Sequence, residues 1–144
     1  MEEKIAEFLK ARTRGVLATC YNGRPHASFM TYIADEQGVN LFMASLKGTT
    51  KYRTLTVNPK VSFLVDNRDD CLRGAAPRIQ ALTAAGICED RTSDPDKDSL
   101  FQRLAEIDPG LANLVRSPEA ALLRLRVESF LFLDGPMESR FVEV

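Results

Sequence analysis

The chain has 144 residues, of which 19 are basic and 20 acidic, and its formal net charge is −1; this length predicts a single domain over residues 1–144. Hydrophobic residues make up 44% of the sequence, which suits a globular protein and excludes a disordered one. The balanced charge gives no global field to attract nucleic acid or an anionic membrane, so neither is expected as a partner.

The first predicted element is a short helix in which Ile5, Phe8 and Leu9 share one face. We expect it to end near Gly15, because glycine can supply a C-terminal cap. Two strands, over residues 16–21 and 24–34, then flank the dipeptide Asn22-Gly23. Asn-Gly between two apolar runs predicts a tight hairpin, because both turn positions require a positive φ.

A second turn over residues 35–38 leads to a third strand over 39–44, and we expect the three strands to form an antiparallel meander. After a polar loop, a short helix is predicted over residues 51–57, with Thr49 or Thr50 as its N-cap. Asn58-Pro59 should end this helix, since the residue before a proline avoids the helical region.

The second half of the chain alternates between strands, a charged loop and helices. Strands are predicted over residues 60–66, 78–88, 121–134 and 141–142, with a loop over 67–77, a helix opened by Asp94-Pro95 and ended at 108–110, and one further helical turn over 111–115. Six or seven strands joined by short connections, with two or three small helices, favour an antiparallel barrel over a parallel α/β sheet.

Cysteine and histidine are too few and too scattered for several kinds of site. The three cysteines form no CxxC pair and His26 is the only histidine, so neither a zinc site nor a disulfide framework is expected. Free thiols predict a reducing cytoplasm. The N-terminus does not have the order of a signal peptide, and no apolar stretch approaches the ~18 residues of a membrane span.

The stretch around the helix over 51–57 contains the most informative polar residues. Helix N-termini present unpaired N–H groups that bind phosphate well. Hydroxyl groups at positions 45, 49 and 50 and positive charges at Lys47, Lys51 and Arg53 surround this N-terminus. A lysine in the first turn opposes the helix dipole unless an anion is present, so the pattern predicts a phosphate site; a capped surface helix is the alternative.

Three segments together resemble a known family: Gly23 to Tyr32, Asp35 to Ser45, and Thr50-Lys51 followed by Leu55, Asn58-Pro59 and Val61. They resemble the pyridoxamine 5'-phosphate oxidase-like proteins, which are FMN-binding split barrels. The resemblance covers about residues 5 to 90. It implies a mainly β fold with small helices, a six- to seven-stranded antiparallel split β-barrel, and a homodimer that binds FMN at its interface.

The resemblance also implies which residues contact the cofactor. The second strand would lie along the flavin ring, the end of the third strand would reach the ring or the ribityl chain, and the hydroxyl and lysine groups would hold the phosphate. The implied contacts are Phe29, Met30, Thr31, Tyr32, Ala44, Ser45, Lys47, Thr49, Thr50 and Lys51. Gln80 would contribute from the partner subunit. The family's late fifth-strand glycine corresponds to Ala84 here, with Gly86 two residues on.

The function implied by the resemblance is an FMN-dependent oxidoreductase with an unknown substrate. The oxidase that names the family uses a tryptophan and an Arg-x-His-like substrate grip, whereas this chain has no tryptophan and no histidine beyond His26. Alternatives are a non-catalytic flavin carrier or sensor, and an F420-dependent reductase of the same fold. A heme protein would need an axial ligand, for which only His26 is available.

Several residues have a structural interpretation beside the functional one. Met30 and Tyr32 could fill the barrel, and Arg124 and Arg126 would face solvent. A patch of three aromatic residues could belong to the subunit interface or to the core: Phe130, Phe132 and Phe141. Cys20 and Cys88 are expected to be buried, and Cys71 is the one cysteine in a charged loop.

Overall fold

The computed structural model describes residues 2–144, with side chains from residue 3 onward. The described strands are β1 (Arg14–Tyr21), β2 (Arg24–Thr31), β3 (Ile33–Ala34), β4 (Asn40–Leu46), β5 (Lys60–Asp66), β6 (Gln80–Asp90), β7 (Ala120–Asp134) and β8 (Glu138–Glu143). The described helices are α1 (Glu2–Lys10), α2 (Thr50–Val57), α3 (Arg68–Leu72), α4 (Lys97–Ile107), the 3-10 turn η1 (Pro109–Leu111) and α5 (Ala112–Arg116).

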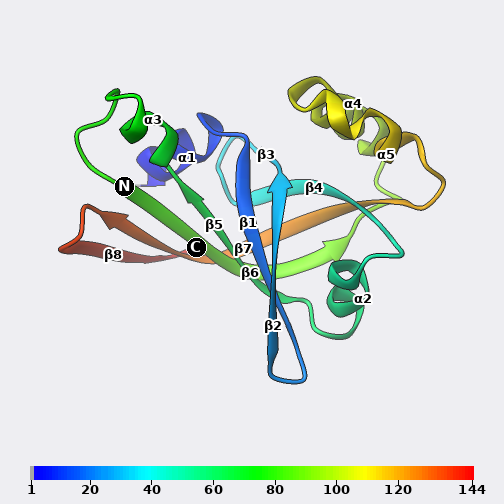
Figure 1. Cartoon of the computed structure of the whole chain (residues 1–144). Coiled ribbons are helices and arrows are strands. Elements are labelled where there is room, and N and C mark those ends of the chain that lie inside the picture. The colour runs from blue at the N-terminus through cyan, green and yellow to red at the C-terminus, as the bar shows by residue number, and fades with distance from the viewer. Residues whose placement is uncertain (1) are drawn as a thin grey trace.

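All eight strands belong to one antiparallel sheet that curls on itself. The order is β2-β1-β5-β6-β7-β4-β3, and β8 pairs with the late part of β7. The two ends of this order, β2 and β3, are consecutive in the chain and separated only by Tyr32. Because the chain passes directly from one end of the sheet to the other, the sheet must bend into a half-barrel (Figure 1). This is the split-barrel fold that the sequence predicted, with eight described strands where six or seven were expected.

The helices lie at different ends of this half-barrel (Figure 1). Helices α1 and α3 lie near the start of β1, and α2 lies toward its far end, where the Asn58 side chain donates to the carbonyl of Cys20 (2.8 Å). Helices α4 and α5 pack against β4. Strand β8 lies along the late part of β7, which pairs with β6 on its other side.

The main core fills the concave side of the sheet. Leu17, Phe63 and Leu82 are fully buried there, and α1 covers one end with Leu9. A second cluster lies on the other face, where Leu104 of α4 packs with Leu122 of β7. Strands β5 and β6 show this directly, because buried residues alternate along them with partly exposed ones.

The hairpin prediction at Asn22-Gly23 is confirmed, since their φ angles are +56° and +77°.

The predicted glycine cap at Gly15 is wrong, because α1 ends at Lys10 and Gly15 lies within β1. Gly15 instead lets the Phe63 ring pack directly against the β1 backbone, because an added Cβ would lie 2.6 Å from that ring. The turn at residues 35–38 is also found, with Gly38 at φ +75°.

The predicted three-strand meander is wrong. The second predicted strand breaks at Tyr32 into β2, which pairs with β1, and β3, which pairs with β4. Strand β4 then pairs with β7 rather than with β2. The turn residues predicted the local hairpins. They did not predict the break between β2 and β3, where Tyr32 turns into the core and its hydroxyl donates to the carbonyl of Leu9 (2.6 Å).

Three other elements differ from prediction. The loop over residues 67–77 contains the short helix α3. Helix α4 begins after Asp96, because the Asp94 carboxylate accepts the Asp96 N–H (2.9 Å) and holds Asp94 in the preceding turn. The last strand is longer than expected, since β8 covers Glu138–Glu143.

The predicted aromatic patch divides between the two faces. Phe130 is buried, and Phe132 packs edge-on against Phe8 (ring centroids 5.6 Å), so both belong to the core, whereas Phe141 is 61% exposed.

Cys88 is buried as predicted, but Cys20 is only half-buried. Within residues 2–144, no helix has the length and apolar character to cross a membrane.

Candidate functional site

The N-terminus of α2 is organised by the side chain of Thr49. This residue is the N-cap, as predicted: its hydroxyl accepts the Tyr52 N–H (3.3 Å) and donates to the Leu46 carbonyl (2.9 Å). The hydroxyl of Ser45, at the buried end of β4, lies 3.1 Å from that of Thr49. Two sequence-predicted residues are therefore brought together where the strand passes into the helix.

The first turn of α2 has free N–H donors and no negative charge. Within residues 2–144, the N–H groups of Thr50 and Lys51 meet no acceptor, and the turn contains no acidic residue. Unpaired N–H groups at a helix start favour an anion. The geometry at this end of α2 therefore fits a phosphate group.

Lys51 is half-buried in this turn. Burial lowers the pKa of its ammonium group. No carboxylate of residues 3–144 lies within 4.0 Å of Lys51. A partly desolvated cation without a counter-ion is unfavourable, and a bound anion would remove that cost.

A carboxylate that the sequence did not indicate lies on the other side of α2. The Tyr52 hydroxyl donates to Asp90 at the end of β6 (2.5 Å), and this bond raises the pKa of Tyr52 to about 12. Burial acts to raise the pKa of Asp90, but hydrogen bonds from Thr92 and Tyr52 and the charge of Lys47 lower it overall. Asp90 stays ionised and gives Lys47 a partial counter-charge.

Arg53 lies one turn further along α2 and folds back over the loop. Its guanidinium donates to the Gly48 carbonyl (2.9 Å). It thereby holds the loop between β4 and α2 against the helix. Lys47 and Thr50 are exposed beside it. The loop thus places three of the sequence-predicted phosphate ligands, Lys47, Thr50 and Lys51, around one helix end.

In the segment predicted to lie along a flavin ring, residues 29–32, only some side chains are exposed to solvent. Phe29 is 73% exposed, but Met30 and Tyr32 are buried in the core, at 5% and 1%. Burial raises the pKa of the Tyr32 hydroxyl strongly. The side chains of Met30 and Tyr32 are therefore packing residues, and only their backbone can face a ligand.

Thr31, at the end of β2, has a partner that sequence patterns did not indicate. Its hydroxyl donates to Asp108 (3.3 Å), the N-cap of η1. Ala44 is buried in the second core cluster, against α4. Gln80 lies at the start of β6 and donates to Asp134 (3.1 Å), so it is not part of the group around α2 in the same chain.

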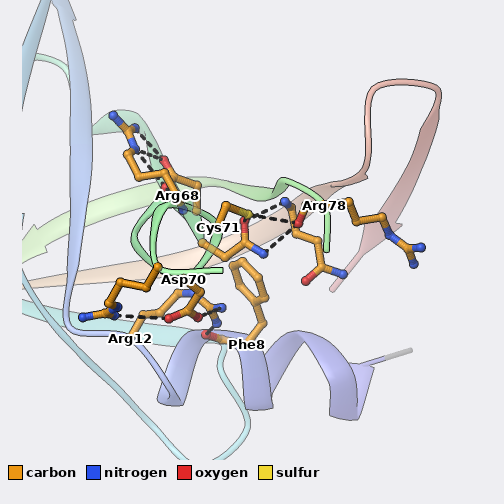
Figure 2. A network of polar contacts seen from close by, with 10 residues as sticks. Phe8, Arg12, Arg68, Asp70, Cys71 and Arg78 are labelled. Carbon is orange, nitrogen blue, oxygen red and sulfur yellow. Dashed lines mark hydrogen bonds and ion pairs between the residues drawn. The ribbon is translucent and has the colours of Figure 1, made fainter. Parts of the chain in front are cut away.

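The polar contacts around α3 form a second network (Figure 2). The Cys71 thiol donates to the carbonyl of Arg78 (3.2 Å), and the Arg78 guanidinium pairs with Asp134 (2.6 Å). Arg12 pairs with Asp70 (3.5 Å). Among residues 2–144, no group of three or more histidine, cysteine and acidic residues is placed to hold a metal ion.

Comparisons with known proteins agree with this architecture. The sequence model of the pyridoxamine 5'-phosphate oxidase family matches residues 1–134. General stress protein 26 of Bacillus subtilis (strain 168) is 27% identical over 125 residues, which cover 83% of this chain and 84% of that protein.

Two solved structures share the fold at low identity. General stress protein 26 from Bacillus anthracis superposes with a TM-score of 0.76 at 19% identity, covering 99% of this chain and 98% of the other. A heme binding protein from Mycobacterium smegmatis gives a TM-score of 0.79 at 18% identity, and this chain covers 58% of its length. Both share the curled sheet and its helices. With its family model matched over nearly the whole length, the chain belongs to the pyridoxamine 5'-phosphate oxidase family.

Proposed function

We propose that this protein binds FMN and acts as an oxidoreductase, with the FMN phosphate at the N-terminus of α2. The observation that carries this proposal is Lys51, a half-buried cation with no counter-ion within residues 3–144, beside the free N–H groups of the same turn. A phosphate would accept from those N–H groups and neutralise the lysine. Family membership supports a bound cofactor.

The chain's own residues would hold the two ends of the cofactor differently. Thr49 and Ser45 fix the loop that presents the phosphate ligands, and Arg53 holds that loop closed. Among the described strands, β2 pairs only with β1, which leaves the backbone of its outer edge available along the predicted ring position. Bound FMN would supply the redox chemistry, while the protein binds and orients it.

We further propose that the protein is a homodimer that associates through the convex face of the sheet. One register row crosses this face from β2 to β8: Phe29, Val16, Leu64, Thr83, Leu131 and Phe141. Paired residues of neighbouring strands point to the same side. Leu131 is 46% exposed and Phe141 is 61% exposed, so the row leaves a long apolar stripe facing solvent.

Heme is a second candidate cofactor, because one structural neighbour is a heme binding protein. His26 is exposed on β2 and is the only histidine that could ligate iron. F420 is a third candidate, since it also carries phosphate. These cofactors give different absorption spectra, so the colour of the purified protein separates them.

The test of the main proposal is a titration of purified protein with FMN, followed by flavin fluorescence. We expect binding at micromolar concentrations or below. Lys51→Ala should weaken FMN binding by about 10- to 100-fold, because it removes a charged hydrogen-bond partner worth ~1.5–3 kcal/mol. Lys60→Ala is the matched control, since Lys60 is exposed at the start of β5.

Two results would reject the proposal. The wild-type protein could fail to bind FMN at micromolar levels, or Lys51→Ala could bind it as tightly as wild type, which would mean that the phosphate lies elsewhere. A Soret band on adding hemin, without any flavin binding, would favour the heme alternative.

A further inference from the structure

Helix α2 has little apolar contact with the sheet. Of its eight residues only Thr54 and Leu55 are buried, and the Tyr52 ring packs against the main core from a half-buried position. A helix of this length is marginal by itself. Its orientation, and with it the direction of the free N–H groups at its start, therefore depends on the hydrogen bonds that tie it to neighbouring elements.

Tyr52 ties the first turn of α2 to the end of β6. Its N–H is bonded to the hydroxyl of the N-cap Thr49 (3.3 Å), and its own hydroxyl donates to the Asp90 carboxylate (2.5 Å). Among residues 3–144, this is the one side-chain hydrogen bond that joins α2 to β6. It starts from the same turn as the free N–H groups of Thr50 and Lys51.

Asp90 is itself fixed by the turn that follows β6. The Thr92 N–H (2.8 Å) and the Thr92 hydroxyl both donate to one of its carboxylate oxygens, Oδ1, while Tyr52 donates to the other, Oδ2. The Thr92 hydroxyl also accepts the N–H of Leu122 on β7 (3.1 Å). Asp90 is thus an anchor that connects the start of α2 to both β6 and β7.

Asp90 also brings a negative charge near the proposed phosphate site. Burial acts to raise the pKa of Asp90, but its hydrogen bonds and the charge of Lys47 lower it overall, so the carboxylate is ionised at pH 7. This charge attracts Lys47, one of the proposed phosphate ligands, and repels an anion. A neutral acceptor at position 90 would hold Tyr52 without that repulsion.

We propose that Tyr52 and Asp90 are positioning residues with opposite effects on the α2 site: their hydrogen bond aims the free N–H groups at a bound phosphate, while the Asp90 charge limits how tightly that phosphate binds. A site limited in this way holds free phosphate weakly and depends on the rest of the ligand for its affinity. That the rest of the ligand is a flavin rests on the proposed function.

The experiment is a titration of the FMN-free protein with FMN and, separately, with inorganic phosphate. Tyr52→Phe keeps the ring and removes the hydroxyl, so we expect both ligands to bind about threefold to tenfold more weakly. Asp90→Asn removes the charge, but its amide oxygen can still accept from Thr92 and its amide N–H can donate to the Tyr52 hydroxyl. We expect both ligands to bind this variant about twofold to fivefold more tightly than wild type.

Riboflavin is the matched ligand control, because it has the flavin ring and no phosphate. Neither substitution should change its affinity. The gain with Asp90→Asn should also shrink at high salt, because it arises from charge. A merely structural contact would instead weaken FMN, phosphate and riboflavin together in both variants.

Two residues far from α2 supply matched control substitutions. Tyr21 is 54% exposed at the end of β1, and the Asp98 side chain is 95% exposed on α4. Tyr21→Phe and Asp98→Asn should bind FMN and phosphate like wild type. Urea unfolding of all four variants checks that each one is folded before it is titrated.

The outcomes separate this proposal from the proposed function. If FMN binds, but Tyr52→Phe and Asp90→Asn shift its affinity in the same direction or not at all, the roles given to Tyr52 and Asp90 are wrong and the flavin function stands. If wild type fails to bind FMN, but phosphate affinity shifts in opposite directions in the two variants, those roles stand and the flavin function is rejected. Binding of neither ligand by wild type would overturn both.

Discussion

Lys51 shows how one residue can oppose folding and favour binding. Its ammonium group is half-buried in the first turn of α2, where the helix dipole and desolvation both disfavour a positive charge. A bound anion at the helix start would offset both costs. The same side chain should therefore lower the stability of the free protein and raise its affinity for an anion.

The variant Lys51→Met tests this opposition. We expect it to raise the free energy of unfolding of the FMN-free protein at pH 7, while it weakens FMN binding. The folded-state pKa of Lys51 is lowered from 10.5, so the charged form destabilises the fold below that folded-state value. This cost declines as pH rises and is gone above 10.5, the unfolded value.

Urea unfolding at pH 7 and at alkaline pH measures both points. The stability difference between Lys51→Met and wild type should shrink as pH rises. Lys60→Met is the control, because Lys60 is exposed at the start of β5 and lies outside α2. A destabilised Lys51→Met protein at pH 7 would show that the lysine stem or its charge supports the helix.

At the scale of elements, the bulge in β6 explains why Gly86, and not Ala84, is the glycine of this strand. The register of β6 against β7 shifts between Ala85 and Gly86. A Cβ at Gly86 would lie 2.1 Å from the carbonyl oxygen of Arg126. Bulges increase local twist and bend a strand, which suits a sheet that has to curl into a half-barrel.

Gly86→Ala should therefore destabilise the protein by about 2–3 kcal/mol, because the backbone of β7 cannot move away as a flexible side chain could. Gly48→Ala is the control, since an added Cβ there meets no atom within 4 Å. Chemical denaturation of both variants measures the difference. Equal stability of the two variants would mean that β6 and β7 can separate at little cost.

Elements with a local signal could be predicted and those fixed by distant contacts could not. The Asn22-Gly23 turn and the Thr49 cap depend on residues next to them, and both were found. The break at Tyr32 depends on the carbonyl of Leu9, 23 residues away in sequence. Helix α3 has no buried residue and therefore no apolar period to reveal it.

The candidate site divides in the same way. The group at α2 could be predicted because Ser45, Thr49 and Lys51 are close in sequence and share one helix start. The Tyr52–Asp90 contact joins residues 38 apart, and the Arg12–Asp70 ion pair joins residues 58 apart. Only the folded sheet brings those residues together.

At the scale of the whole molecule, part of the convex face of the curled sheet is exposed. The concave face is packed, and α4 and α5 pack on the convex face against β3, β4 and β7. Elsewhere the convex face carries the row from Phe29 to Phe141, in which Phe29, Leu131 and Phe141 are exposed. A second copy of the chain, docking row to row about a two-fold axis, would bury this stripe twice, as isologous interfaces do.

Sedimentation measures this prediction directly, because the chain mass is 16.0 kDa and a dimer has about twice that mass. Leu131→Lys places a charge within the exposed row, next to Phe141, and should produce monomers, since an unpaired buried charge strongly disfavours association. Val57→Lys is the control, because Val57 is 65% exposed on α2 outside the row. If wild type sediments as a monomer, or Leu131→Lys remains a dimer, the row is not the interface.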